Sequence, residues 1–400
     1  MAGKYNYFFL GMVYPTWTKC FFFGKNRGMK EGHQFGRPGL RGAAGWVCAV
    51  LLAVLLARLG AGLREMRGGG EAAHGRGVPP ALNVVMMGLG GFRGILAEVL
   101  WFRMSRLQME GRYLELTQLS DWITRLDPHA TQAWTYNAWN LAYNVSAMMR
   151  RPEDRLRWVA NGILLLRNDA LDWIRDDPQL YRELAWLYRN KIGSSLDRAH
   201  VLYKLSLAET MAPLVDETDG TIPENLSPET RTELLAMRLD PQTMRALQTR
   251  FGPLDWRMAE SHALYWSMLG LAHADADSLL ACRRDVYQTL LTASMEQGRF
   301  TGDLEAGVWS AASNEKLLDG AENFLRETHG LFPREGVASM YARFLAHRIR
   351  LAGTPRDEIE ARYGQLRALA PEGAQTIPLE LLLELPAMPP EFFRRAPTPQ

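Results

Sequence analysis

The pattern of apolar and polar positions divides the chain into an apolar stretch near its beginning and a long helical region after it. Residues 42–63 hold no charged side chain before Arg58. At about 1.5 Å per residue a helix of this length covers about 33 Å, enough to cross a hydrocarbon core of about 30 Å. Arg58 lies near the end, where a long side chain reaches the headgroups. The pattern therefore predicts one transmembrane helix over residues 42–63.

After the span, residues 64–80 contain three consecutive glycines and end in Pro-Pro, which predicts a flexible linker. From residue 81 to about residue 370 apolar residues recur at helical spacing, and no run of alternating β-branched residues appears. We therefore expect an all-α body. It divides into helical repeats over 81–211, an acidic loop over 212–230, further helical hairpins over 231–370 and a Pro-rich tail over 371–400.

Five pairs of a capping residue followed by proline predict where helices begin. The pairs are Asp127-Pro128, Asp177-Pro178, Ser227-Pro228, Asp240-Pro241 and Thr354-Pro355. The side-chain oxygen of the first residue accepts a hydrogen bond from an amide of the first helical turn, and proline has no amide hydrogen to leave unpaired there. We therefore expect a helix to start at each of these five prolines.

Short motifs around residue 111 resemble the tetratricopeptide repeat (TPR), a two-helix unit of about 34 residues. Gly111-Arg112-Tyr113 matches the turn between the two helices of that unit, and Leu126-Asp127-Pro128 matches its end. Two later helices then open as the family's first helix does, and both place an Ala-Trp pair in the same register. The matching residues are Trp134, Ala138 and Leu141 in one helix, and Tyr181, Ala185 and Tyr188 in the other.

The resemblance covers about residues 97–195. It implies a TPR-like α-solenoid, a right-handed stack of helix pairs in which each pair buries the apolar face of its neighbour. It also implies a concave groove for peptides or partner proteins, and it implies no enzyme activity.

The segment before the span, residues 1–41, is basic and aromatic. Residues 1–28 hold nine aromatic side chains and four positive charges without an acid, which suits the membrane interface. The alternative is that translation starts at Met29 and that residues 1–28 are not made. The positive charges favour a cytoplasmic N-terminus and an exported body, in the periplasm of a bacterium. We expect an uncleaved anchor, since no clean small-x-small cleavage site follows the apolar stretch.

Charge and cysteine usage exclude several classes of function. The chain holds 46 Lys and Arg against 44 Asp and Glu, without the concentrated basic face that nucleic acid requires. Only Cys282 of the three cysteines follows the predicted span, so the body can form neither an internal disulfide nor a cysteine-based zinc site. No nucleophile elbow, phosphate loop or paired-histidine motif is present. We expect no nucleic acid, cofactor, metal or small-molecule substrate, and no enzyme activity.

The densest group of candidate binding residues lies in the first of the two Ala-Trp helices. Asn137, Asn140 and Asn144 are spaced by three and four residues, so their amides share one helix face beside Tyr136 and Tyr143. Such amides can bond an extended peptide backbone. The alternative is that they bond neighbouring backbone within the stack.

Five tryptophans of the helical region are also candidates, because tryptophan dominates binding hot spots. At helical spacing in a repeat, we expect most of Trp134, Trp139, Trp186, Trp256 and Trp266 in the core. Trp139 and Trp186 are the better surface candidates. The predicted partner-binding set is therefore Tyr136, Asn137, Trp139, Asn140, Tyr143, Trp186 and Arg189.

These observations favour a membrane-anchored helical-repeat scaffold or protein- and peptide-interaction module, single-pass and facing the periplasm. The alternative is an accessory or assembly subunit of a membrane complex, in which the anchor and residues 81–107 make the decisive contacts. A hydrolase or transferase built on a helical repeat is a third reading, for which no catalytic residues can be named.

The orientation of the anchor predicts where the C-terminus lies. A reporter enzyme that is active only in the periplasm, fused after Gln400, should be active in intact bacteria. Activity of a cytoplasmic reporter at the same position would reverse the predicted orientation.

Overall fold

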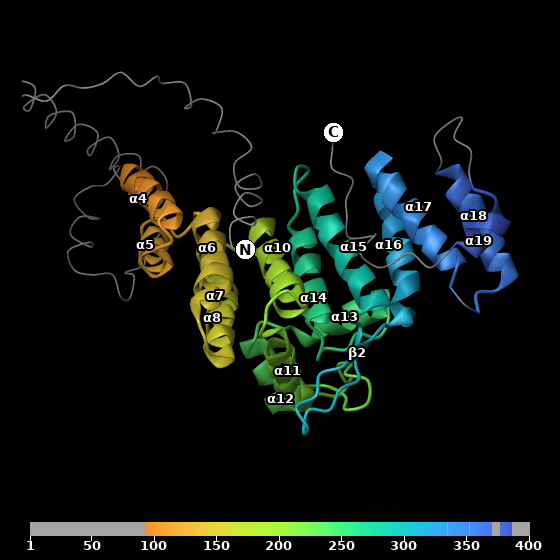
Figure 1. Ribbon diagram of the computed structural model, residues 1–400, viewed down its shortest axis with the longest axis horizontal. Helices are drawn as coiled ribbons and strands as arrows, with labels where there is room; N and C mark the ends of the chain where they lie inside the picture. Colours follow the sequence, from red (N-terminus) through yellow and green to blue (C-terminus); the bar gives the residue numbers. More distant parts are fainter. Residues whose placement is uncertain (1–92, 334, 352, 370–376, 386–400) are drawn as a thin grey trace, which may run out of the picture. The chain divides into compact units, whose positions relative to one another are not determined.

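The structure is a computed structural model, and it describes residues 93–385 apart from 334, 352 and 370–376 (Figure 1). The predicted span over 42–63, the linker over 64–80 and the segment over 1–41 lie outside these residues, as does most of the tail over 371–400. Among the described residues, no helix is both long and apolar enough to cross a membrane. The membrane anchor therefore remains a prediction from the sequence.

Helices make up most of the described residues, which confirms the all-α fold. The first half contains three helices that change locally from α to π form and then continue or end. Its elements are α4 (Arg93–Met109), α5 (Tyr113–Leu126), α6–η2–α7 (Thr131–Trp139, Asn140–Val145, Ser146–Met148), α8–η3–α9 (Pro152–Leu164, Leu165–Ala170, Leu171–Trp173) and α10–η4 (Pro178–Trp186, Leu187–Ile192).

The described residues of the second half are mostly helical and include one small hairpin, in which Arg299 pairs with Ala312 and Phe300 with Ala311. The sequence pattern did not predict this hairpin, because strands of two residues are too short to show alternation. The elements are α11 (His200–Met211), η5 (Ala212–Leu214), α12 (Pro228–Ala236), α13 (Pro241–Phe251), α14 (Ala259–Ala272), α15 (Leu279–Met295), β1 (Arg299–Phe300), β2 (Ala311–Ala312), η6 (Glu315–Leu317), α16 (Leu318–Leu331), α17 (Glu335–Ile349), α18 (Arg356–Ala368) and α19 (Leu379–Glu384).

Three of the five predicted helix starts are confirmed. Helices α10, α12 and α13 begin at the expected prolines, where Asp177, Ser227 and Asp240 accept hydrogen bonds from first-turn amides. A fourth is confirmed to within one residue, since α18 begins at Arg356, directly after Pro355; the hydroxyl of Thr354 donates to the carbonyl of Leu351 and does not cap this helix. The fifth was wrong, because Pro128 lies in a turn before α6.

The π turns occur at matching places in the two Ala-Trp helices. Each begins directly after its tryptophan, at Asn140 after Trp139 and at Leu187 after Trp186. A backbone bond that spans five residues closes each turn, from the amide of Ser146 to the carbonyl of Leu141 and from Gly193 to Tyr188. π turns are uncommon and frequent at functional sites. The two Ala-Trp helices therefore share the position of this irregularity as well as their register.

Neighbouring helices in the sequence pack on one another, with one main exception. Contacts join α4 to α5, α5 to α6 and α8 to η2. In the series from α14 through to α18, each helix contacts the one before it. The exception is α10, whose main neighbour is α14 (Figure 1). One continuous core runs from Trp134 to Leu345, and a smaller one joins α4, α5 and α6 around Met104 and Leu116. The fold is thus an all-α fold of sequentially packed helices.

The space around two helical glycines predicts opposite effects of alanine on stability. A Cβ added at Gly162 in α8 would lie 2.7 Å from the backbone oxygen of Ala138 in α6. We expect Gly162→Ala to lower the free energy of unfolding by about 1–3 kcal/mol. At Gly364 in α18 nothing lies within 4 Å of an added Cβ. Gly364→Ala should therefore raise the free energy of unfolding, by about 0.5–1 kcal/mol. Denaturant unfolding followed by circular dichroism measures both, and equal effects would contradict the packing.

Candidate functional site

Four half-buried aromatic side chains form a continuous row across α4, α6 and η2. Ring centroids lie 6.0 Å apart between Trp101 and Tyr136, 6.5 Å between Tyr136 and Trp139, and 5.6 Å between Trp139 and Tyr143. We call Trp101, Tyr136, Trp139 and Tyr143 the aromatic row. Each of the four is partly accessible, so the row combines a fixed position with exposed aromatic area.

Helix geometry and one hydrogen bond hold the row in place. Tyr136, Trp139 and Tyr143 lie three and four residues apart, so they share one face of the helix. The Tyr136 hydroxyl donates to Oε1 of Gln108 at 2.6 Å, which ties α6 to α4. The row therefore depends on the α4–α5–α6 packing as well as on its own helix.

Trp186 and Arg189 lie in the second Ala-Trp helix, α10–η4. The Arg189 guanidinium lies 5.8 Å from the centroid of the Trp186 ring. One guanidinium nitrogen of Arg189, Nη1, donates to the carbonyl of Asp285 at 3.2 Å and lies 3.4 Å from the hydroxyl of Thr289, both in α15. Arg189 thus links η4 to α15 through neutral acceptors.

Lys191 connects the two Ala-Trp helices. Its ammonium lies 4.9 Å from the centroid of the Tyr143 ring and 2.6 Å from Oδ2 of Asp197. Asp197 also binds Arg155 at 3.0 Å. Burial lowers the pKa of Lys191, and the bond to Asp197 opposes that shift. The end of the aromatic row is therefore fixed by a half-buried network of two cations and one carboxylate.

The predicted amide face is not a surface. Asn140 is fully buried, and its amide donates to the carbonyl of Tyr113 at 3.3 Å and to the hydroxyl of Thr117 at 3.2 Å, both in α5. Its own oxygen accepts from Asn144 at 2.9 Å. Asn137 is also buried, at 3% exposed. Asn140 therefore follows the alternative interpretation, in which the amides bond neighbouring backbone within the stack. Neither Asn137 nor Asn140 is accessible to a partner in this structure.

The tryptophans divide as the sequence predicts. Trp134, Trp256 and Trp266 are buried in the core, whereas Trp139 and Trp186 are half-buried. Five of the seven predicted partner-binding residues therefore stay partly accessible on the two Ala-Trp helices: Tyr136, Trp139, Tyr143, Trp186 and Arg189. Binding of a partner by these residues is untested and stays a prediction.

Two buried carboxyl groups escaped the sequence analysis. Glu260 in α14 is 1% exposed, and neither of its oxygens has a hydrogen-bond partner among the described residues. Burial raises the pKa of Glu260 to about 7. Glu183 in α10 is half-buried as a residue, but its Oε1 is inaccessible and unbonded within the described chain, and burial raises its pKa to about 8. The available signal for Glu183 was its place on one helix face with the apolar residues Leu180 and Leu187.

His262 lies two residues from Glu260 and has a different environment. Its Nε2 donates to the carbonyl of Trp256 at 3.0 Å, and its ring stacks on Tyr188 with centroids 5.0 Å apart. Burial lowers the pKa of His262 to about 4. The imidazole is therefore neutral near neutral pH and acts as a packed aromatic ring with one hydrogen bond.

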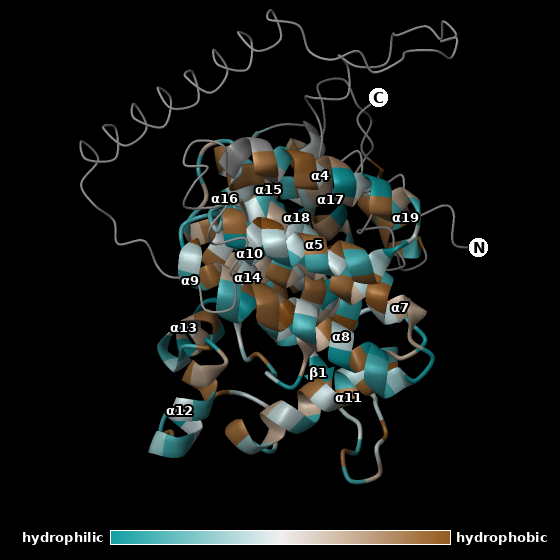
Figure 2. Cartoon of the chain, turned by 90° about the vertical axis from the view of Figure 1, so that its left-hand side faces the viewer, coloured by the Kyte–Doolittle hydropathy of each residue, from teal (hydrophilic) through white to brown (hydrophobic). Residues whose placement is uncertain are grey.

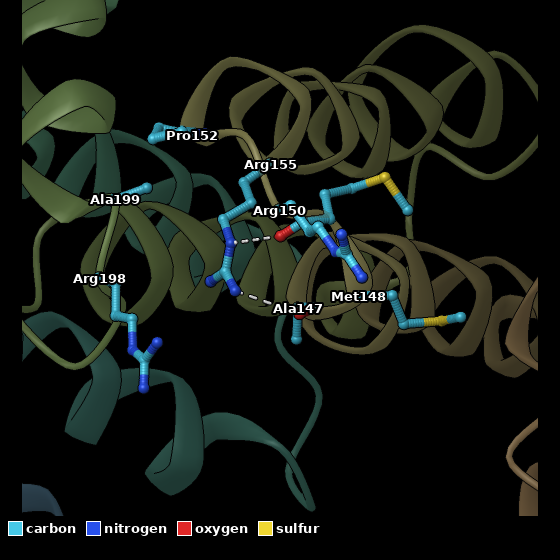
Figure 3. Close-up of a pocket in the computed structure, with 8 residues that line it drawn as sticks. Ala147, Met148, Arg150, Pro152, Arg155, Arg198 and Ala199 are labelled. Atoms are coloured by element: carbon cyan, nitrogen blue, oxygen red, sulfur yellow. Dashed lines mark hydrogen bonds between the residues drawn. The ribbon is translucent and has the colours of Figure 1, made fainter.

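A cavity of about 460 Å³ lies where α7 ends and where α8 and α11 begin (Figure 3). Arg155 dominates its wall and donates to the carbonyls of Met149 and Ala147 at 2.9 and 3.1 Å (Figure 3). Because Arg155 also binds Asp197, its donors are used within the fold. Arg150 and Arg198 line the same cavity but lie apart in the close-up. The cavity is basic without a converged set of free donors.

A second cavity, of about 320 Å³, lies at the α4 end of the aromatic row. Trp101 forms part of its wall, together with Ala130, Thr131, Gln132, Asp177 and Gln179. A partner that covers the aromatic row would find polar groups there. Within the described ranges, no three His, Cys, Asp or Glu side chains are grouped so that they could hold a metal ion.

The chain is thus an all-α protein in which helices pack in sequence, and it carries a half-buried aromatic row. Comparison with protein-family models, with curated proteins and with solved structures gives no match to this chain. The TPR resemblance therefore rests on the residues quoted above.

The buried carboxyl of Glu260 predicts an unusual dependence of stability on pH. Its pKa rises from an ordinary 4.5 to about 7 on folding, so the folded chain keeps a proton that the unfolded chain loses between these values. Stability from this group is complete below pH 4.5 and is lost as pH rises through 7, by about 3 kcal/mol in all. Glu260→Gln should remove this loss.

Denaturant unfolding at about pH 5 and about pH 8 measures the effect. The free energy of unfolding of Glu260→Gln minus that of wild type should be larger at the higher pH than at the lower. The control is Glu209→Gln at an exposed site in α11, for which the difference from wild type should not change with pH. A Glu260→Gln difference that is equally flat would show that the carboxyl is not buried in solution.

Proposed function

We propose that this chain is a helical-repeat interaction module that binds a protein or peptide through the aromatic row, Trp186 and Arg189. The observation that carries the proposal is the continuity of the row, in which four rings from three elements touch in sequence and all remain partly exposed. The proposal retains the expectation that the chain is not an enzyme and uses no cofactor, metal or nucleic acid.

The chemistry of these side chains suits a protein partner. Tyr, Trp and Arg are the residues most enriched in binding hot spots, because they offer large contact areas and hydrogen-bond donors at low entropic cost. The rings of Trp139 and Tyr143 already stack, with 25° between their planes, so ordering them costs little on binding. Stacked, partly exposed rings support a preformed binding surface.

We further propose that the helix stack is a TPR-like α-solenoid. The turn between α4 and α5 has Gly111 at a positive φ of 71°, as a tight helix turn requires. Trp139 and Trp186 stand in one register and are each followed by a π turn. The packing of α10 on α14 departs from a simple repeat, which supports a stack with an insertion over α11, α12 and α13.

The proposed module is held at a membrane by the apolar residues 42–63, with its body on the periplasmic side. This part of the proposal rests on the length and charge pattern of the sequence alone. An anchored module would meet partners at the membrane surface.

A second candidate is an accessory or assembly subunit of a membrane complex, in which residues 81–107 make the decisive contacts. One observation favours it. Val99 and Phe102 in α4 are 57% and 77% exposed, and both lie within that segment. Replacing residues 42–63 with an unrelated span would separate the two, since only the subunit reading requires the native anchor.

Alanine substitutions in the binding surface test the proposed function. We expect Trp139→Ala and Trp186→Ala each to weaken partner capture by about tenfold or more, since a tryptophan hot spot contributes about 2 kcal/mol. Affinity capture of the tagged full-length protein from membranes, with quantitation of the co-purified partner, is the measurement.

The matched control is Trp122→Ala in α5, where the tryptophan is 38% exposed and stands outside the aromatic row. It should leave capture unchanged. Thermal melting of each variant separates binding from folding. If Trp139→Ala and Trp186→Ala retain full capture while they fold normally, the surface is not the binding site.

A further inference from the structure

The smaller cavity, of about 320 Å³, lies where the first turns of α6 and α10 meet α4. One wall is Trp101 of α4, which is also the first ring of the aromatic row (the α4 end of the molecule faces the viewer in Figure 2). The polar part of the lining is Thr131 and Gln132 from α6 and Asp177 and Gln179 from the start of α10. Ligand sites have volumes of roughly 300–1,000 Å³, so this cavity suits one side chain. It is continuous with the proposed binding surface through Trp101.

Asp177 supplies the one charge in the lining of this cavity, and no cation among the described residues pairs with it. Its Oδ1 accepts from the backbone amide of Gln179 at 2.8 Å, and its Oδ2 accepts from the hydroxyl of Thr131. Both donors are neutral. The two oxygens of a carboxylate offer about four acceptor positions, of which these bonds use two. The cavity therefore holds a negative charge with free acceptor positions.

The aromatic wall favours a positively charged group as well. Among aromatic side chains, an indole attracts a cation most strongly. The half-buried Trp101 ring is held against Tyr136, with 6.0 Å between centroids and 67° between planes, so it is ordered before anything binds. The methylene stem of a lysine or arginine packs on apolar surface while its charged end reaches a polar group. An acidic group would repel Asp177, and an apolar group would cover its carboxylate without a counter-charge.

We propose that this cavity receives a lysine or arginine side chain of the partner protein, with the cationic end on Asp177 and the methylene stem against Trp101. The inference rests on the proposed function for the existence of the partner, and it adds the charge that the partner carries. A partner that follows the aromatic row as far as Trp101 reaches the cavity. The cavity then contributes to specificity, because an acidic or apolar side chain at that place leaves Asp177 desolvated and unpaired.

The charge preference of the cavity can be measured without the partner, by disulfide exchange in the full-length protein. The variant is Gln132→Cys, at an exposed position of the cavity wall, with Cys20 and Cys48 replaced by Ser and buried Cys282 kept. The probes are equal amounts of the disulfides of cysteamine and of mercaptoethanol, which add a cationic and a neutral group of similar length. Mass spectrometry of the protein gives the ratio of the two adducts.

The reference for this ratio is Leu196→Cys in the same chain, where the side chain is 86% exposed in the loop after η4. We expect the ratio of cationic to neutral adduct to be about threefold or more higher at Gln132→Cys, because the nearby carboxylate attracts the ammonium. Dividing by the reference ratio removes the intrinsic difference between the two probes.

Asp177→Asn tests the carboxylate itself, because asparagine caps a helix about as well as aspartate and removes only the charge. It should abolish the preference for the cationic adduct at Gln132→Cys. In a chain without that cysteine it should reduce partner capture by about threefold. The matched control is Asp240→Asn, which alters the same Asp-Pro cap at the start of α13 and should change neither readout.

Each readout can overturn the inference. An adduct ratio at Gln132→Cys equal to the reference, or a preference that survives Asp177→Asn, contradicts a cation site. A preference that Asp177→Asn abolishes without loss of capture also overturns the inference, because the bound group is then a free amine. If Trp139→Ala and Trp186→Ala keep full capture but Asp177→Asn lowers it, the proposed surface fails while the cation site stands.

Discussion

The contact between α10–η4 and α14 is the interaction on which the rest of the structure depends. Tyr181 stacks on Trp266 with ring centroids 6.3 Å apart, and Tyr188 stacks on His262 at 5.0 Å. The approach is close enough that a Cβ on Gly270 would lie 3.1 Å from the Cβ of Tyr181. This aromatic layer joins the helices before residue 193 to those after residue 258, so it fixes Trp186 and Arg189 relative to α15.

The same helix carries part of the candidate surface. One side of α10–η4 packs on α14, while Arg189 bonds α15 and Trp186 lies half-buried beside it. Two carboxyl groups lie in this part of the fold, and burial raises the pKa values of both Glu183 and Glu260.

Much of the fold could be predicted from local signals. Asp177, Ser227 and Asp240 cap their helices because the oxygen of a short polar side chain before proline can accept a hydrogen bond from a first-turn amide. The division of the tryptophans followed from helical spacing. Pro128 was misread because a turn uses the same Asp-Pro pair, and Asn140 because spacing shows which residues share a face but not which neighbour covers it. The π turns and the α10–α14 contact depend on tertiary packing, which spacing along one helix does not encode.

The central claim is that the surface formed by the aromatic row, Trp186 and Arg189 binds a partner protein. The most direct measurement is photocrosslinking in living cells, with a photoreactive amino acid placed in turn at positions 139, 186 and 122. The account predicts that positions 139 and 186 crosslink to the same protein and that position 122 does not. No crosslink at either of the first two positions, or an equal crosslink at position 122, would contradict it.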